Sequence, residues 1–382
     1  MYSHAMHDSY FSSNDSSNRL PAYSFYNFAA RQAFSRSLRI PTKLNDEVLT
    51  ETPVIAVLVL PPLDYPNEDR GEMVASYVKW LESAGARVVP LFFDIPDEEI
   101  DRILDSVNGV LFTGGEDFIS LDPENAYTHT AHRVLDRVKE YNDQGITFPL
   151  WGTCLGFEMI CCLETDTMDI LSATEGVERI ALPLNFTSYA SSSALYAASS
   201  HADDEVLSVC VERIALPLNF TSYASSSALY AASSHADDEV LSVCATENVA
   251  LNAHSWSVLM TDFYSYPELY ESYNLLSTNK SPGDDSVFVS SIEHTTYPIF
   301  GTQYHPEKNG YEFFSQYPDS IHAKESVRAM HTLAENFVMY ARMNDNSFDD
   351  EDELNNSLIY NYDPTFTGKN DGVMEQTYYF PL

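Results

Sequence analysis

A cysteine stands between two glycines in the segment Gly152-Thr153-Cys154-Leu155-Gly156, which separates an expected strand from an expected helix. This is the Gly-x-nucleophile-x-Gly pattern of a nucleophile elbow, with Cys where many hydrolases have Ser. The small flanking residues allow a tight turn that lifts the side chain above the sheet. The following helix directs its N-terminal N–H groups at the sulfur, which favours the thiolate. The pattern predicts Cys154 as the nucleophile of a hydrolase.

A nucleophile needs a base, and the base needs an orienting group. His305-Pro306-Glu307 supplies both at the end of a late expected strand. In an extended chain residues i and i+2 share a face, and Pro306 disfavours helix. The carboxylate of Glu307 can then hold the tautomer of His305, which serves Cys154 as base and proton donor. A His-x-Glu alone is usually structural, but beside the elbow it predicts a triad.

Acyl transfer also needs hydrogen-bond donors for the oxygen that becomes negative in the transition state. The backbone N–H of Leu155, directly after the nucleophile, is one expected donor. Gly114 and Gly115 end a neighbouring expected strand. We expect Gly115 to supply the second N–H and Gly114 to contact substrate, although a Gly-Gly pair is also typical of a plain turn.

The segments around these residues alternate between buried strands and amphipathic helices. This alternation predicts an α/β fold, a mostly parallel, doubly wound sheet with helices on both faces. Ligands of such sheets bind at the carboxyl ends of strands, where Cys154 and Gly114 fall. The expected strands are 54–60, 86–93, 109–115, 147–152, 287–293 and 297–305, and the expected helices are 73–85, 97–107, 131–145, 155–164 and 323–343.

A unit of 34 residues occurs twice, because residues 177–210 recur without a single change as residues 211–244. Two identical copies do not suit a solenoid, so we favour a recent in-frame duplication or an error in the gene model. The sheet needs only one copy, and the other is expected to protrude as an insertion. We expect a mobile N-terminal extension over 1–52, a catalytic domain over 53–382 and an acidic loop over 344–356.

The chain has 382 residues, a formal net charge of -37 and a pI near 4.3. Such an acidic protein is not expected to bind nucleic acid or an anionic membrane surface. No apolar run is long enough to span a bilayer. The five cysteines suggest neither a disulfide framework nor a zinc site, so no metal is expected. The chemistry outlined above needs no metal or organic cofactor.

Several segments together resemble the gamma-glutamyl hydrolase family, which belongs to the class I glutamine-amidotransferase-like superfamily and to peptidase family C26. The likeness keeps the same order from about Pro53 to about Gly368, apart from the extra copy. The segments are SYVKWLESAGARVVPL (76–91), NGVLFTGG (108–115), WGTCLGFE (151–158), LPLNFT (182–187, repeated at 216–221) and GTQYHPEKNGYEF (301–313).

The resemblance implies a catalytic cysteine at Cys154 and a catalytic histidine at His305. It also implies a further active-site histidine in ALNAHSW, which is His254 and is expected to bind substrate. The family cleaves the gamma-glutamyl bonds of folylpoly-gamma-glutamates, so the implied partner is a small molecule. A homodimer is a further expectation. Family members usually work in lysosomes, in vacuoles or outside the cell, although no signal peptide is visible at this N-terminus.

A polyglutamate chain is anionic, so this acidic protein needs local cations to hold it. Lys308, directly after the triad, is the first candidate, and Lys280, Lys324 and Arg328 are weaker ones.

Two other functions stay open. A glutaminase of the class I amidotransferase type uses the same elbow and the same His-x-Glu. The continuation Phe157-Glu158 counts against it, because those glutaminases commonly have Gln at the second position. The other alternative is a catalytically impaired relative that acts as a binding protein, with its pocket blocked by the extra copy.

Overall fold

The structure is a computed structural model that describes residues 48–62, 70–115, 120–122, 124–190, 193–196, 239–369 and 372–381. Residues 1–47 of the expected N-terminal extension lie outside the described residues. At its described end, the N–H groups of Leu49 and Thr50 donate to the carbonyl oxygen of Arg342, at 2.8 and 3.1 Å. None of the helices in these ranges is long and apolar enough to cross a membrane.

The central sheet has eight strands in the order β3-β1-β4-β5-β13-β12-β11-β8. The first five are parallel and the last three antiparallel, so the prediction of a mostly parallel sheet is confirmed. The strands are β1 (Val54–Leu58), β3 (Arg87–Leu91), β4 (Gly109–Phe112), β5 (Leu150–Thr153), β8 (Asn185–Phe186), β11 (Tyr273–Lys280), β12 (Val287–His294) and β13 (Ile299–Thr302).

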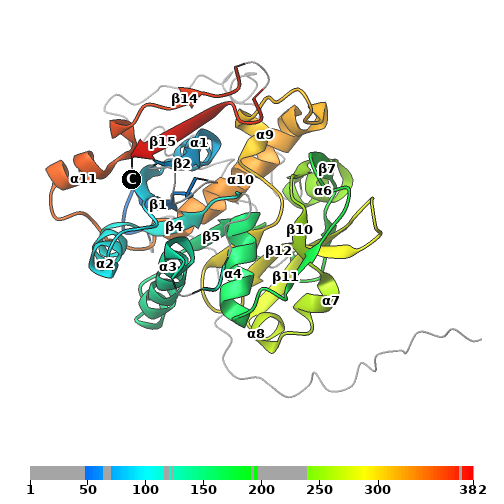
Figure 1. The fold of residues 1–382 in the computed structure, drawn as a ribbon, viewed down its shortest axis with the longest axis horizontal. Coiled ribbons are helices and arrows are strands. Elements are labelled where there is room, and N and C mark those ends of the chain that lie inside the picture. The colour runs from blue at the N-terminus through cyan, green and yellow to red at the C-terminus, as the bar shows by residue number, and fades with distance from the viewer. Residues whose placement is uncertain are drawn as a thin grey trace, which may run out of the picture. The chain divides into compact units, whose positions relative to one another are not determined.

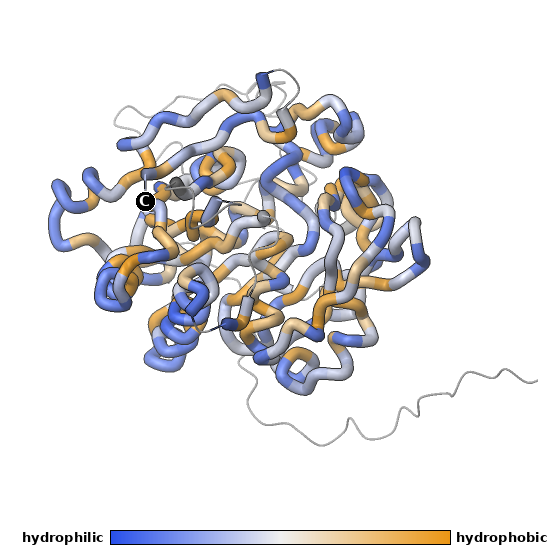
Figure 2. The backbone as a smooth tube through the Cα atoms, in the orientation of Figure 1, coloured by the Kyte–Doolittle hydropathy of each residue, from blue (hydrophilic) through white to orange (hydrophobic). Residues whose placement is uncertain are grey.

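Helices cover both faces of this sheet, as predicted (Figure 1). On one face lie α2 (Asp97–Ser106), α3 (Ala126–Asp143) and α4 (Leu155–Thr165), and on the other α1 (Ala75–Ser83) and α10 (Lys324–Ala341). Alternate residues of one strand serve the two cores, because successive side chains of a strand point to opposite faces. Ala56 and Leu58 belong to the core under α2, α3 and α4, whereas Ile55 and Val57 belong to the core under α1 and α10. Figure 2 shows the hydrophobic segments gathered in this interior.

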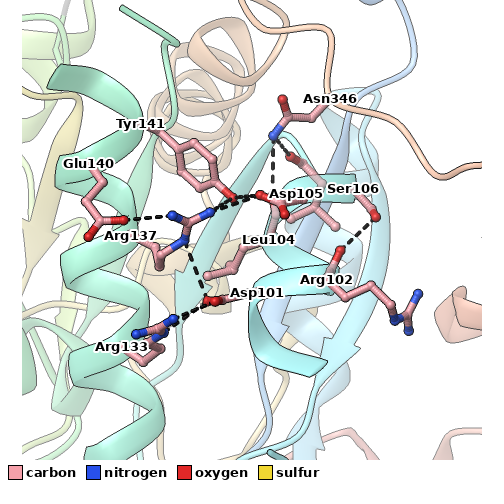
Figure 3. Close-up of polar contacts among 11 residues, drawn as sticks. Asp101, Arg102, Leu104, Asp105, Ser106, Arg133, Arg137, Glu140, Tyr141 and Asn346 are labelled. Atoms are coloured by element: carbon pink, nitrogen blue, oxygen red, sulfur yellow. Dashed lines mark hydrogen bonds and ion pairs between the residues drawn. The ribbon is translucent and has the colours of Figure 1, made fainter. Parts of the chain in front are cut away.

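Helices α2 and α3 are also joined by charge pairs (Figure 3). Arg133 pairs with Asp101 at 2.5 Å, and Arg137 pairs with Asp105 at 3.0 Å. Helix α3 begins five residues before the predicted start at 131, because the side chain of Asn125 accepts the N–H of Thr128 at 2.9 Å. These pairs fix the outer layer and lie away from the expected chemistry.

The C-terminal part returns to the body as a three-stranded sheet of order β14-β15-β2, formed by β14 (Thr365–Phe366), β15 (Gln376–Pro381) and β2 (Arg70–Val74). The expected acidic loop 344–356 is partly helical, since α11 (Glu351–Ser357) begins within it. The Asp350 carboxylate caps this helix by accepting the Glu353 N–H at 2.8 Å, and the acidic first turn complements the helix dipole.

The remaining elements lie around the sheet. They are β6 (Leu171–Ala173), β7 (Ile180–Leu182), β9 (Ala250–Asn252), β10 (Trp256–Val258), α6 (Glu239–Thr246), α7 (Met260–Phe263), α8 (Pro267–Tyr270), α9 (Lys308–Tyr311) and the short 3-10 helices Asp319–His322 and Ile359–Asn361.

The described residues of the repeated unit come from both copies. The first copy contributes 177–190 and 193–196, and the second contributes 239–244. Counted from 177 and from 211, these are positions 1–14, 17–20 and 29–34 of the unit, so no position is described twice. The two parts meet directly, because the N–H of Leu184 donates to the carbonyl oxygen of Cys244 at 2.6 Å. The described fold is therefore built on a single composite unit.

Candidate active site

Three neighbouring strands bring the predicted site residues to one edge of the sheet. In the register of these strands Phe112 of β4 pairs with Gly152 of β5, and Thr153 of β5 pairs with Thr302 of β13. The segments that follow these strands therefore leave the sheet side by side. They carry Gly114 and Gly115 after β4, Cys154 after β5, and His305 with Glu307 after β13.

Cys154 occupies the sharp turn between β5 and α4. Its backbone has φ 51 and ψ -110, a left-handed value of φ that non-glycine residues rarely adopt. A β-carbon on Gly152 would lie 2.6 Å from the carbonyl oxygen of Gly156, and one on Gly156 would overlap the backbone of Phe112. Both glycines are therefore required for the turn, as the elbow pattern predicts.

The imidazole of His305 is held by Glu307, whose Oε1 lies 2.7 Å from Nδ1. The backbone of Glu307 has φ -70 and ψ -22, so the chain is not extended through His-Pro-Glu as the sequence suggested. The carboxylate reaches the imidazole across the turn that starts α9. The backbone N–H of His305 also donates to the carbonyl oxygen of Leu251 at 2.9 Å.

Gly114 lies close to both the predicted base and the predicted nucleophile. A β-carbon there would come within 2.7 Å of His305 Cε1 and 3.2 Å of Cys154 Cβ, so both side chains pack against a position that has room only for glycine. The N–H of Gly114 donates to the hydroxyl of Tyr77 at 2.7 Å, and that hydroxyl is 3.5 Å from Nδ1 of His305. Tyr77 thus joins the strand end to the triad.

Gly115 is the neighbour of Leu155, since a β-carbon on Gly115 would lie 3.0 Å from Leu155 Cδ2. The N–H of Gly114 is engaged by Tyr77, so it is not the better oxyanion donor of the glycine pair. Gly115 therefore stays the predicted second oxyanion donor of the pair.

Two adjoining cavities share Gly115, Cys154, Glu178 and Ala253 in their linings. The first, of about 360 Å³, is lined by Gly114, His305, Lys308 and C-terminal residues such as Met374. The second, of about 300 Å³, is lined by Leu155, Glu158 and His254. Gly115 and Cys154 line both. Seven of the eight residues predicted for the site therefore line these cavities. The eighth, Glu307, is fully buried against His305.

Burial raises the pKa of the Cys154 thiol well above its usual value, and the charge of Glu158 raises it further. The N–H of Leu155 and the charge of Lys308 lower it, in the direction predicted for the helix N-terminus, but they do not outweigh burial. The expectation that Cys154 rests as a thiolate is corrected accordingly. The protonated thiol is the favoured form here.

The histidines near Cys154 are held neutral. Burial lowers the pKa of His305, although the charge of Glu307 acts in the opposite sense. Burial acts to raise the pKa of the Glu307 carboxyl, but its contacts with His305 and the charge of Lys308 outweigh burial, and the net shift is downward. Burial lowers the pKa of His254 to about 3. Its Nδ1 donates to the carbonyl oxygen of Trp256 at 2.9 Å, which fixes the ring at the wall of the second cavity.

Lys308 is a buried cation in the first cavity, with 1% of its surface exposed. Burial acts to lower its pKa, but the neighbouring Tyr317 and the carboxylates of Glu307 and Glu312 outweigh burial, so the net shift is upward and the ammonium stays charged. Its Nζ lies 3.2 Å from the sulfur of Met374. Within the described part of the chain it forms no ion pair with a carboxylate.

The weaker cation candidates are not brought to the cavities. Lys280 pairs with Asp285 at 2.7 Å and Lys324 with Glu325 at 3.2 Å, both on the surface. Arg328 lines neither cavity.

Sequence reasoning missed Tyr77, Glu158 and Arg179. Tyr77 lies on an expected amphipathic helix, where an aromatic residue is normally part of the core. Glu158 is buried on α4 and accepts the side-chain N–H of Gln303 at 2.8 Å. Arg179 lines the first cavity from within the repeated unit. None of the three carries a local pattern that marks it as functional. Across the described ranges, no group of three or more His, Cys, Asp or Glu residues could hold a metal ion.

Comparisons with known proteins show the family to which this chain belongs. The Peptidase C26 family model matches residues 53–168. Gamma-glutamyl hydrolase B of Dictyostelium discoideum is 32% identical over 334 residues, which cover 87% of this chain and 84% of the relative. Gamma-glutamyl hydrolase of Homo sapiens is 34% identical over 316 residues, which cover 82% of this chain and 84% of the relative.

Among solved structures, the glutaminase domain of Trypanosoma brucei CTPS with bound acivicin matches with a TM-score of 0.43 and 12% identity. The match covers 77% of this chain and 95% of that one.

Proposed function

Since the chain belongs to the gamma-glutamyl hydrolase family, we propose that it hydrolyses the gamma-glutamyl bonds of folylpoly-gamma-glutamates with Cys154 as nucleophile. The observation that carries the proposal is the packing of both His305 and Cys154 against Gly114, in a cavity that the buried cation Lys308 also lines. A thiol, a neutral imidazole and an unpaired ammonium suit attack on the amide of an anionic substrate.

In the acylation step, Nδ1 of His305 donates to Glu307, which leaves Nε2 to accept the proton of the Cys154 thiol. The sulfur attacks the gamma-carbonyl carbon, and the carbonyl electron pair moves to the oxygen. The N–H groups of Leu155 and Gly115 stabilise the oxyanion. Because the thiol and the imidazole are both neutral beforehand, proton transfer accompanies the attack, and Glu307 stabilises the imidazolium that forms.

In the second half of the reaction, the imidazolium of His305 gives its proton to the leaving alpha-amine as the C–N bond breaks. A water molecule then loses a proton to His305 and attacks the thioester. Collapse of the second oxyanion releases the carboxylate, and the proton returns to Cys154. Because His305 serves the leaving amine, the leaving glutamate belongs on the His305 side, in the first cavity.

Lys308 is proposed to bind a carboxylate of that leaving glutamate. Its ammonium stays charged and forms no ion pair with a carboxylate in the described part of the chain, so it can pair with a carboxylate of the ligand. His254 is proposed to contact the acyl part of the substrate in the second cavity, as a neutral hydrogen-bonding group.

The acidic surface also suits an acidic compartment, because self-repulsion falls as carboxylates protonate. We therefore propose a vacuolar, lysosomal or secreted location. We also propose that residues 53–382 form the catalytic domain and that the protein is a homodimer. Cell fractionation tests the location, and light scattering of the purified chain tests the dimer.

The test is incubation of the purified chain with pteroylpenta-gamma-glutamate, with an alpha-linked pentaglutamate as control, and with Cys154→Ala beside the wild type. The expected result is release of glutamate or short gamma-glutamyl chains from the gamma-linked substrate only, and loss of turnover in the variant. Undiminished turnover in Cys154→Ala would reject the mechanism.

The same assay separates the alternatives. Ammonia from free glutamine, without cleavage of the gamma-linked chain, would assign a glutaminase. A folded chain that binds the pteroyl substrate without turnover would assign an impaired relative.

A further inference from the structure

The arginine of the repeated unit stands at the entrance of the first cavity. Arg179 lines the same cavity as Cys154, His305 and Lys308. It comes three residues after Gly176 in the segment that leads into β7, and it is exposed where Lys308 is buried. The cavity thus has one cation in its depth and a second at its rim.

The guanidinium of Arg179 is positioned by neutral groups. One terminal nitrogen donates to the side-chain oxygen of Gln316 at 2.8 Å. Its central carbon lies 5.4 Å from the ring centroid of Phe314, within the range of a cation–π contact. In the described part of the chain Arg179 forms no ion pair with a carboxylate. The remaining N–H donors are therefore available to a ligand, and a guanidinium can bind a carboxylate with two parallel hydrogen bonds.

The backbone of Arg179 is held in an unfavourable conformation. Its φ is 58, in the left-handed region that glycine adopts readily and arginine does not. Such a conformation costs free energy and is found preferentially at binding and catalytic sites. Its sequence neighbour Glu178 is fixed separately, by accepting the Ser255 hydroxyl at 2.7 Å.

The acidic side chains around the first cavity repel an anionic ligand, so binding of such a ligand needs a second cation. The first cavity is lined by two carboxylate side chains, Glu72 and Glu178, in addition to Lys308 and Arg179. Without Arg179 the acids would outnumber the bases at the entrance, and the field of the whole acidic chain would act in the same direction.

We propose that Arg179 binds a carboxylate of the second glutamate beyond the scissile bond and so makes the enzyme prefer leaving groups longer than one residue. This inference rests on the proposed function, because it takes the leaving chain to lie in the first cavity. Lys308 then holds the glutamate nearest to His305, and the chain continues outward to Arg179. In this arrangement a single leaving glutamate is bound by Lys308 alone.

The duplication supplies a matched control. Arg213 occupies the same position in the second copy, with identical neighbours in sequence, and lies outside the described residues. The experiment compares Arg179→Ala, Arg213→Ala and the double variant with the wild type. These variants remove the same arginine from the first copy, from the second copy or from both. Arg179→Gly removes the same cation while relieving the positive φ, which separates loss of charge from loss of folding.

The experiment measures kcat and KM with pteroyldiglutamate, which can release only one glutamate, and with pteroylpentaglutamate. Arg179→Ala and Arg179→Gly are expected to raise KM for the pentaglutamate about tenfold, as for loss of a charge-assisted hydrogen bond. KM for the diglutamate and kcat for both substrates should stay within about twofold of the wild type, and so should all constants of Arg213→Ala. The KM of the wild type for the longer substrate should also rise with ionic strength more than that of Arg179→Ala.

Wild-type KM values for both substrates in the double variant would overturn the inference while leaving the proposed function intact. An equal rise in KM for the two substrates would also overturn the inference, because it states that Arg179 acts only on substrates with the longer leaving chain. A length-dependent rise that appears only in the double variant would support it and show that either copy can fill this position. If the wild type cleaves neither substrate, the proposed function itself fails.

Discussion

The backbone N–H of Leu184 donates to the carbonyl oxygen of Cys244 at 2.6 Å, which joins the first copy of the repeated unit to the end of the second. Cys210 is the residue of the first copy that corresponds to Cys244. In the described residues, parts of both copies together therefore form one structural unit.

Deletion of one copy is expected to preserve both fold and activity. Removing 177–210 or 211–244 yields the same sequence, so the shortened chain is unambiguous and retains every residue type of the composite unit. The free energy of unfolding should change by about 1 kcal/mol or less, the scale of loop-closure costs. Urea unfolding and the pentaglutamate assay of both chains check this. A shortened chain that is insoluble or inactive would show that the second copy contributes structure of its own.

Glu307→Gln is expected to lower kcat with little change in KM. The neutral amide cannot stabilise the imidazolium of His305. Because the imidazolium forms only in the transition state, the substitution removes more stabilisation from the transition state than from the bound ground state. By comparison with other triads the loss should be about 10²- to 10⁴-fold. Steady-state kinetics measure it, with Glu325→Gln on the surface as a control. A variant with unchanged kcat would remove Glu307 from the mechanism.

Lys308→Met should raise KM strongly and leave the fold intact. The ammonium is buried beside the sulfur of Met374, so a methionine fits the same apolar wall and removes a desolvated charge. We expect KM to rise about 10- to 100-fold, as for loss of a buried ion pair with substrate. Thermal unfolding should show a folded variant with a lower melting temperature, because the buried carboxylates of Glu307 and Glu312 lose a nearby cation. Lys324→Met, at an exposed position, is the control, and a similar KM in both variants would contradict the assignment.

His254 should make the fold less stable in acid. Its pKa falls from 6.5 to about 3 on folding, because the imidazole is buried. Between these values the unfolded chain binds the additional proton, so the free energy of unfolding decreases as the pH is lowered from 6.5 toward 3. The contribution is roughly 4 kcal/mol over that window. Urea unfolding at several pH values between 4 and 7 measures this dependence. In His254→Asn the free energy of unfolding should decrease less steeply as the pH is lowered. An identical slope in both proteins would refute the effect.

Much of the site could be predicted because its signals are local. The elbow is defined within five residues, since Gly152, Cys154 and Gly156 fix their own turn. The alternation of strands and helices then placed Cys154, Gly114 and His305 at neighbouring strand ends without knowledge of any contact between them.

The tertiary structure decided what depends on residues distant in sequence. Tyr77 reaches Gly114 and His305 only because α1 packs on the same edge of the sheet, and nothing in its own segment marks it. Arg179 likewise enters the cavity from a small sheet formed by β7 and β9.

The protonation state of the nucleophile was also beyond the sequence. A helix N-terminus lowers a thiol pKa, and that feature can be read from the pattern around Cys154. Burial raises the pKa, and here it outweighs the helix. Burial depends on every segment that packs over the sulfur. The sequence alone thus predicted which atom is the proposed nucleophile, and the tertiary structure decided how deeply that thiol is buried and in which direction its pKa shifts.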